Sequence, residues 1–177
     1  MKAAKTAKTN AARLLDSLGI AYEARAYEVD PEDLSAIAVA RKIGLPAEQV
    51  FKTLLTRAAS GEYFFAVIPG DSELDLKKLA QAAEVKKVEL ASLKEVEPLT
   101  GYVRGGVTVM AARAAFPAYV DEPIEMHEVV SISAGVRGTQ LLLAPAEYLR
   151  AIGGTLADLT KILRDAASSE AGKEVGE

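Results

Sequence analysis

The feature that most restricts the fold of this chain is a pair of apolar runs joined by a short polar link. The first run, "VFKTLLTR" at 50–57, and the second, "YFFAVIP" at 63–69, flank a link that contains Gly61. Apolar runs of this length, bounded by turn-forming residues, are typical of buried strands, and a short glycine-containing link predicts an antiparallel hairpin between them. We therefore expect part of the core to be built on an antiparallel sheet.

Helical and strand patterns alternate along the rest of the chain. Apolar spacing and helix-end signals predict helices at 11–18, 34–43 and 76–83, and others that begin near Ser92, Pro145 and Thr155. Short alternating or apolar segments predict strands at 20–29, 86–90, 116–122, 126–133 and 139–145, and one at the end of the glycine-bearing segment 99–110. Helices interspersed with hairpins give a mixed, mostly antiparallel sheet with helices packed on it, which is an α+β fold.

The length of the chain favours one domain. A chain of 177 residues can bury a sizeable core, and two domains would fit only if both were small. Half of the residues are hydrophobic and 26% are charged, which is the composition of an ordinary globular protein. We expect a single domain over 9–163, with flexible ends at 1–8 and 168–177.

Composition excludes several kinds of functional site. The chain has no cysteine, so disulfides and thiol chemistry are impossible, and with His127 as its one histidine a multi-histidine metal site is excluded as well. A net charge of −4 argues against broad contact with a nucleic-acid backbone, so any contact with RNA should be local. No segment has the pattern of a secretory signal or a membrane span, so we expect a cytoplasmic protein without a metal or a cofactor.

Lys52 is unusual for its place in the first apolar run. Side chains alternate between the two faces of a strand, so Lys52 shares a face with Val50 and Leu54. On one interpretation it lies on an edge strand, where its charge opposes pairing with another sheet. On the other it lines a cleft, where its ammonium group binds an anion or polarises an ester carbonyl. Composition alone does not decide between the two.

Two glycine-bearing turns are further candidates for a binding site. The segment "GYVRGG" contains Gly101, Gly105 and Gly106, where a backbone without Cβ atoms can approach a ligand and present its N–H groups. It has the spacing of neither a Walker loop nor a dinucleotide-binding fingerprint. The segment "SISAGVRG" contains Ser133 and Gly135. Ordinary turns remain the alternative for both segments.

The order of four segments resembles a known family. "VFKTLL", "LDLKKLAQAAEVKKVE", "TGYVRGG" and "VSISAGVRG" resemble the successive signatures of the YbaK/EbsC group of aminoacyl-tRNA editing domains, which is related to the insertion domain of bacterial prolyl-tRNA synthetases. The resemblance extends from about Thr9 to Leu163. It implies a curved sheet with helices around it and a free-standing hydrolase that cleaves the ester of a mischarged tRNA, typically a proline tRNA carrying cysteine or alanine. The implied partners are the tRNA acceptor end and a prolyl-tRNA synthetase.

The resemblance also assigns roles to particular residues. Lys52 matches the essential lysine of the family, Gly105 a glycine of the substrate loop and Ser133 a serine near the terminal ribose, so these three form the expected catalytic set. The expected substrate-binding residues are Tyr27, Thr53, Gly101, Gly106 and Gly135. No side chain is an obvious nucleophile or general base. We therefore expect that the glycine loop holds the ester, that Lys52 fixes the acceptor end, and that water or the substrate's own hydroxyl or thiol attacks.

Three positions depart from the family pattern. Val109 stands where a proline is common, Ala134 where a glycine is usual, and Gln140 where some members have an aspartate. Because a proline would stiffen the wall of the pocket, its absence predicts an enzyme that accepts alanine and serine as well as cysteine. The departures leave two alternatives open: a non-catalytic module that binds a synthetase or the tRNA end, and a cleft that binds or hydrolyses an unrelated small anion.

Overall fold

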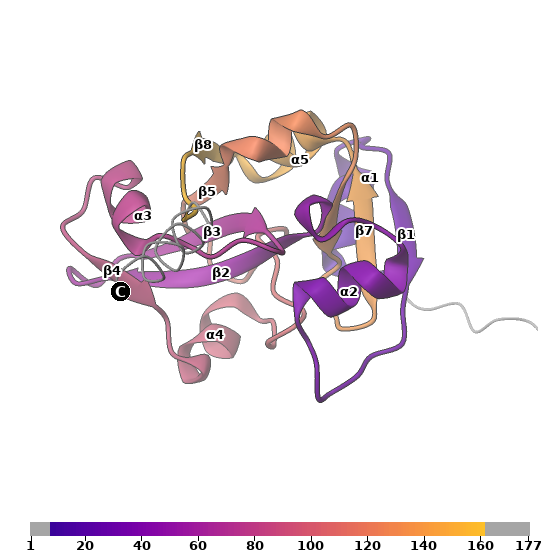
Figure 1. Cartoon of the computed structure of the whole chain (residues 1–177), viewed down its shortest axis with the longest axis horizontal. Helices are drawn as coiled ribbons and strands as arrows, with labels where there is room; N and C mark the ends of the chain where they lie inside the picture. The colour runs from indigo at the N-terminus through magenta and orange to yellow at the C-terminus, as the bar shows by residue number, and fades with distance from the viewer. Residues whose placement is uncertain (1–7, 162–177) are drawn as a thin grey trace, which may run out of the picture.

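The computed structural model describes residues 8–161 (Figure 1). Apart from Lys8, the predicted flexible ends lie outside this range. The helices are α1 (Asn10–Ser17), α2 (Ala36–Ile43), α3 (Leu76–Ala82), α4 (Leu93–Thr100) and α5 (Pro145–Ile152), with 3₁₀ turns at Ala47–Gln49 and Glu122–Met126. The strands are β1 (Glu23–Ala26), β2 (Phe51–Ala58), β3 (Tyr63–Pro69), β4 (Val88–Leu90), β5 (Ala118–Asp121), β6 (Val130–Ser133), β7 (Thr139–Leu143) and β8 (Thr155–Ala157).

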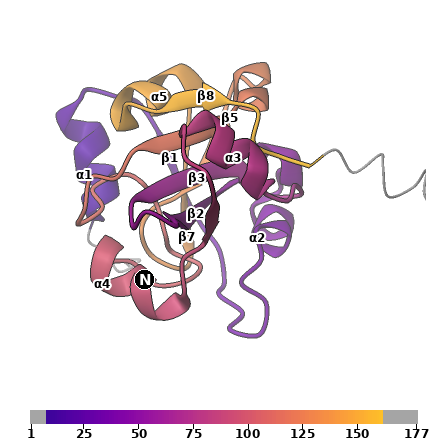
Figure 2. The same ribbon diagram turned by 90° about the vertical axis from the view of Figure 1, so that its left-hand side faces the viewer.

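The predicted hairpin lies at the centre of a five-stranded sheet. β2 and β3 pair antiparallel, with Phe51 opposite Pro69 and Arg57 opposite Tyr63. The strand order is β4-β2-β3-β5-β8, in which β4 is antiparallel to β2 while β5 and β8 run parallel to β3. Helices α4 and α5 lie on opposite sides of the hairpin in both Figure 1 and Figure 2. The expected α+β fold with a mixed, mostly antiparallel sheet is confirmed.

A smaller antiparallel sheet, with the order β1-β7-β6, stands beside the first. In Figure 1 it lies at the right, with α1 and α2 near it. A bridge between Val50 and Ser131 joins the start of β2 to β6, so the two sheets meet where the first apolar run begins. The core at this junction includes Phe51, Val67 and Ile132, which are at most 2% exposed. The start of β2 is therefore held by both sheets.

Several predicted strands are shorter than expected, and one is absent; of the strand predicted at 20–29 only Glu23–Ala26 is formed. Two other segments have an identifiable cause. Residues 107–110 form no strand, although Met110 is 1% exposed, because the apolar alternation buries these side chains where no neighbouring strand pairs with them. The predicted strand at 126–133 begins only at Val130, because the 3₁₀ turn Glu122–Met126 occupies the residues before it. In both segments a local apolar pattern reflects burial but does not give strand pairing.

The predicted helix start at Thr155 is wrong. Thr155–Ala157 is β8, which pairs parallel to β5 and has Leu156 opposite Val120. Within the described residues the chain stays extended beyond β8, where Thr160 bridges Leu74. The threonine and acidic residue that resembled a helix start are used differently, because the outer edge of β5 offers this segment a full set of backbone partners.

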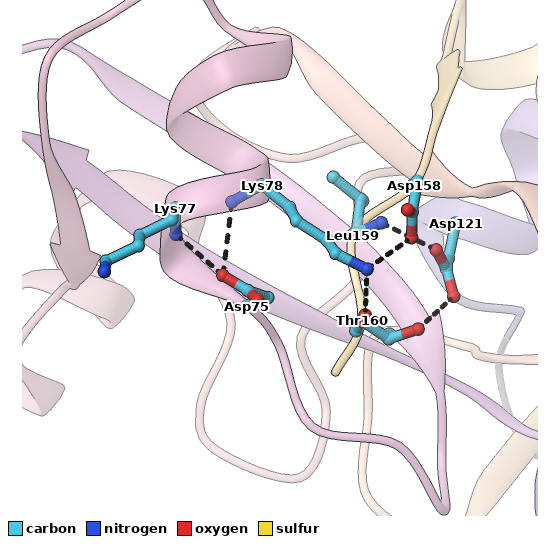
Figure 3. Close-up of polar contacts among 7 residues, drawn as sticks. All are labelled: Asp75, Lys77, Lys78, Asp121, Asp158, Leu159 and Thr160. Carbon is cyan, nitrogen blue, oxygen red and sulfur yellow. Dashed lines mark hydrogen bonds and ion pairs between the residues drawn. The ribbon is translucent and has the colours of Figure 1, made fainter. Parts of the chain in front are cut away.

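A polar network fixes the segment after β8 (Figure 3). The carboxylate of Asp121, which is 1% exposed, accepts hydrogen bonds from the Leu159 amide at 2.9 Å and the Thr160 hydroxyl at 3.0 Å. From α3, the Lys78 ammonium donates to Asp158 at 3.0 Å and to the Thr160 carbonyl at 2.8 Å. Side chains from β5 and α3 therefore hold the same short segment.

We expect Asp121→Asn to reduce the pH dependence of stability. Burial raises the pKa of Asp121 above its ordinary value of 3.8, so folding favours the protonated carboxyl. That contribution is fully present below the pKa of the unfolded state and is lost as the pH rises through the pKa of the folded state. In urea unfolding between about pH 4 and about pH 7, the free energy of unfolding of the variant should therefore rise relative to that of the wild type as the pH rises. A parallel pH profile for both proteins would contradict the expectation.

Asp121→Ala is the matched structural control for this prediction. It leaves the buried Leu159 amide without its acceptor, and an unsatisfied buried group costs about 1–3 kcal/mol. The alanine variant should therefore be less stable than the asparagine variant at every pH, because asparagine retains a carbonyl oxygen that can accept from the Leu159 amide.

Candidate active site

A cleft of about 610 Å³ lies at the junction of the two sheets. Its lining comes from the loop before α2 and α2 itself, from β2, from the corner between β4 and α4, from the glycine loop, and from β6 and β7. Four of the residues singled out in the sequence line this first cleft: Lys52, Thr53, Gly105 and Ser133. Three segments that are far apart in the sequence thus contribute to one cavity.

Lys52 reaches this cleft from the first half of β2. Its ammonium nitrogen donates to the Gly70 carbonyl at 3.3 Å, and its side chain is half-buried. Burial lowers the pKa of Lys52, whereas the nearby carboxylates of Asp71 and Glu73 act in the opposite direction. β4 pairs with β2 only at Thr56–Ala58, so Lys52 lies in a part of β2 that β4 does not cover, and the strand order does not exclude an edge position. Its place in the lining of the cleft favours the interpretation as a ligand-binding lysine.

Gly70 is a part of the site that the sequence interpretation missed. A Cβ atom at this position would lie 2.7 Å from the Val50 carbonyl and 2.8 Å from the Ala36 Cβ, so only glycine fits. This close approach brings the end of β3 against the start of β2 and places the Gly70 carbonyl beside Lys52. The Pro-Gly pair at 69–70 was the available signal, because such pairs mark turns.

The glycine loop is held in place by the turn that follows β6. The Arg137 guanidinium donates to the Arg104 carbonyl at 2.7 Å, and a Cβ atom on Gly106 would lie 3.2 Å from the backbone of Val136. Gly105 has a φ of +86°, a conformation that favours glycine. The Gly106 amide donates to the Val103 carbonyl, whereas the Gly105 amide has no hydrogen-bond acceptor within residues 8–161. The Gly105 N–H is thus the better placed of the two to bind a ligand.

β6 and β7 contribute polar groups to the opposite wall. Ser133 and Gln140 face each other in the β6–β7 pair and both line the cleft. Gln140 is 5% exposed, and its Oε1 accepts a hydrogen bond from the Ser131 hydroxyl at 2.9 Å. The Ser133 hydroxyl accepts from the Gly135 amide at 3.2 Å. These contacts fix the side chains that face the ligand space.

Four of the predicted site residues do not line the first cleft. Tyr27 packs against the apolar side of α2, and its amide donates to the Gly138 carbonyl. Gly101 ends α4 in the left-handed conformation. Gly106 and Gly135 pack the glycine loop and the turn after β6 against each other.

Val109, where the family commonly has a proline, packs between two hydrophobic clusters. Val107 lines the cleft instead.

Two acidic residues on the outer part of the cleft were also missed. Glu32 and Asp33 precede α2, and the Asp33 carboxylate accepts from the Ser35 amide at 3.1 Å. Hydrogen bonds from Ser35 lower the pKa of Asp33, so it is a weak proton acceptor. His127 does not line the cleft and packs edge-on against Phe51. Neither Asp33 nor His127 is therefore suited to act as a general base in this cleft.

The described residues contain neither a cluster of metal ligands nor a membrane-spanning helix. Between residues 8 and 161, no group of three or more histidine, aspartate or glutamate side chains could hold a metal ion. None of the helices in this range is long and apolar enough to cross a membrane.

Comparisons with known proteins place this geometry in a family. Residues 30–151 match the family described as "Aminoacyl-tRNA editing domain". A protein of Enterococcus faecalis named for Cys-tRNA(Pro)/Cys-tRNA(Cys) deacylase activity, EbsC, is 40% identical over 153 residues, which are 86% of this chain and 93% of EbsC. Proline–tRNA ligase 1 of Streptomyces avermitilis is 37% identical over 81 residues, 45% of this chain and 14% of the ligase.

A solved structure has a similar fold. The crystal structure of hypothetical protein APE2540 has a TM-score of 0.78 and 26% identity, over 86% of this chain and 99% of that one. The match over residues 30–151 covers more than half of the chain, and the similarity to EbsC extends along nearly the whole of both proteins. The chain belongs to the family of aminoacyl-tRNA editing domains.

Proposed function

We propose that this chain is a trans-acting deacylase that hydrolyses the ester of a mischarged tRNA, with a proline tRNA carrying cysteine or another small amino acid as the first expectation. The observation that carries the proposal is the convergence of Lys52, Gly105 and Ser133 on one cleft. The similarity to EbsC, which is named for this activity, supports the substrate class. We expect the protein to act in the cytoplasm, where mischarged tRNA would be met.

The geometry suggests how the ester is cleaved. Water, or a hydroxyl or thiol of the aminoacyl group itself, attacks the carbonyl carbon, and the bond from that carbon to the ribose oxygen breaks. The Gly105 N–H is placed to stabilise the oxyanion, and the leaving ribose oxygen takes up the proton that the attacking group releases. Lys52 fixes the nearby phosphate or ribose by charge, Ser133 supplies a hydroxyl to the same cleft, and Thr53 belongs to its lining. The protein's contribution is position and electrostatics.

Substrate range is the second part of the proposal. We expect cysteinyl, alanyl and seryl esters on the same tRNA to be hydrolysed with kcat/KM values within about a hundredfold of each other, because one methylene or hydroxyl changes selectivity by only about 1–3 kcal/mol in an apolar pocket. Val107, which lines the cleft, is the side chain to test, and Val109→Pro should have less effect on the ratios than Val107→Ala. A preference for one ester by several orders of magnitude would contradict the broad range.

The deciding experiment follows ester loss from a panel of mischarged proline tRNAs. Hydrolysis of at least one member by the purified protein supports the proposal, and a prolyl-tRNA synthetase added in a parallel set tests whether that partner increases the rate. The similarity to part of a proline–tRNA ligase is the reason to choose this synthetase first. Binding of the panel without ester loss would favour the non-catalytic module instead.

A further inference from the structure

A second cleft, of about 720 Å³, adjoins the first. The two clefts share three lining residues, Lys52, Leu54 and Leu90. The second cleft continues from these residues to the loop between β3 and α3, the start of α3, and Lys161. Lys52 therefore lies at the junction of two cavities, and the ligand space beside it is longer than an aminoacyl group requires.

The charges in the second cleft favour an anion. Its carboxylates are already engaged: Asp75 accepts from the amides of Lys77 and Lys78 at 3.0 and 3.2 Å, and Glu73 pairs with the Lys161 ammonium at 3.2 Å. The Lys77 ammonium makes no hydrogen bond or ion pair within residues 8–161. In Figure 3 its side chain extends away from Lys78 and from the segment that Lys78 binds. Among the described residues, Lys52 and Lys77 are thus the two lysines of this cleft whose ammonium groups form no ion pair, although Asp71 and Glu73 lie near enough to Lys52 to act on its pKa.

Apolar side chains line the second cleft together with the two ammonium groups. Leu90 is 56% exposed, although it is a large aliphatic side chain, and Leu54 and Leu76 are partly buried beside it in the lining. An exposed apolar surface beside unpaired cations suits a ligand that combines anionic and flat apolar groups. A single-stranded nucleotide has both, since its phosphate binds ammonium groups and its base packs on apolar side chains.

Resting on the proposed function, we infer that the second cleft binds the nucleotide that precedes the terminal adenosine of the tRNA. With the ester at Gly105 in the first cleft, the phosphate of the terminal nucleotide reaches the junction at Lys52. The next nucleotide then enters the second cleft, its base against Leu90 and its phosphate toward Lys77. Such a contact is local, so it agrees with the negative net charge of the whole chain.

The test compares Lys77→Ala with the wild type on two substrates that carry the same aminoacyl group. One is the mischarged tRNA, and the other is 3′-O-aminoacyl-adenosine 5′-monophosphate, a ribose ester whose phosphate ends at the junction. We expect KM for the tRNA to rise about tenfold. The slope of log KM against log salt concentration should become smaller by about one, as for the loss of one phosphate contact. The values for the short substrate should stay unchanged. Lys86→Ala, which removes an exposed lysine that lines neither cleft, is the matched control.

Equal effects of Lys77→Ala on both substrates, or no effect on the tRNA, would overturn the inference. If the wild-type protein hydrolyses neither substrate, the proposed function fails separately, and binding of the unacylated, 5′-phosphorylated dinucleotide pCpA decides the role of the second cleft. Weaker pCpA binding by Lys77→Ala than by Lys86→Ala would then support the second cleft as a nucleotide site, and equal binding by the two variants would refute it.

Discussion

Replacing Lys52 with methionine should lower kcat/KM for ester hydrolysis by about a hundredfold or more, since losing one preorganised electrostatic contact in an active site costs about that much. The free energy of unfolding should stay within about 1 kcal/mol of the wild type. Methionine retains most of the apolar stem of the lysine side chain, so the loss isolates the ammonium group. Ester hydrolysis on a mischarged tRNA and urea unfolding give the two quantities.

The small effect on stability follows from the position of the charge. Burial lowers the pKa of Lys52, so the folded state disfavours its charged form, and stability would rise as the pH passes through the pKa of the folded state toward that of the unfolded chain. Because the Lys52 ammonium group does not stabilise the fold, we expect its role to be ligand binding. Lys52→Arg should restore little activity, because a planar guanidinium does not replace a compact ammonium in a shaped cavity.

Two outcomes would contradict this assignment of Lys52. If Lys52→Met hydrolyses the ester as fast as the wild type, Lys52 is not required for the reaction. The control is His127→Ala, which alters a side chain that packs on Phe51 outside both clefts and should leave the rate unchanged. A hundredfold loss in that variant, with the fold intact, would show that a general base had been overlooked.

Local signals in the sequence predicted most of the helices and the central hairpin. Ser92 and Glu95 form a capping box at the predicted start of α4, and Pro145 begins α5 as predicted. These features depend on residues a few positions apart, so their physical causes are contained in short segments. The same is true of the hairpin, whose two strands adjoin one short turn.

Features that depend on distant residues could not be predicted in this way. The bridge between Val50 and Ser131 joins the two sheets, and β8 forms because the edge of β5 is open to it. The first cleft depends on the same junction. Lys52 and Ser133 were found through their resemblance to family signatures, whereas Gly70 and the second cleft became evident only from close approaches in the structure.

Gly135→Ala should destabilise the protein and impair hydrolysis together, although Gly135 lies outside the cleft. Its φ is +89°, and a Cβ atom there would lie 2.8 Å from the Tyr102 ring. The Tyr102 hydroxyl donates to the Met110 carbonyl at 2.6 Å, so the ring cannot retreat without breaking a half-buried contact. Tyr102 belongs to the glycine loop, and a displacement of about 1 Å in a positioning element can lower the rate by about a hundredfold.

Gly61→Ala separates the two causes of this destabilisation. Gly61 has a φ of +97°, close to that of Gly135, but nothing lies within 4 Å of the position its Cβ would take. Backbone strain alone should cost about 1–2 kcal/mol in this variant and leave kcat/KM unchanged. Gly135→Ala should cost at least about 1 kcal/mol more in urea unfolding, because forcing extra atoms into a packed site adds to the strain.

A double-mutant cycle identifies the ring as the obstacle. In a Tyr102→Leu background, which removes the aromatic atoms nearest the new methyl group, Gly135→Ala should cost no more than Gly61→Ala does in the wild type. The coupling would show that Gly135 is required because Tyr102 passes so close to it, and that this contact sets the position of Gly105. Equal costs for Gly135→Ala and Gly61→Ala with Tyr102 intact would mean that the ring yields freely, and the glycine loop would then owe its position to the Arg137 contact with the Arg104 carbonyl.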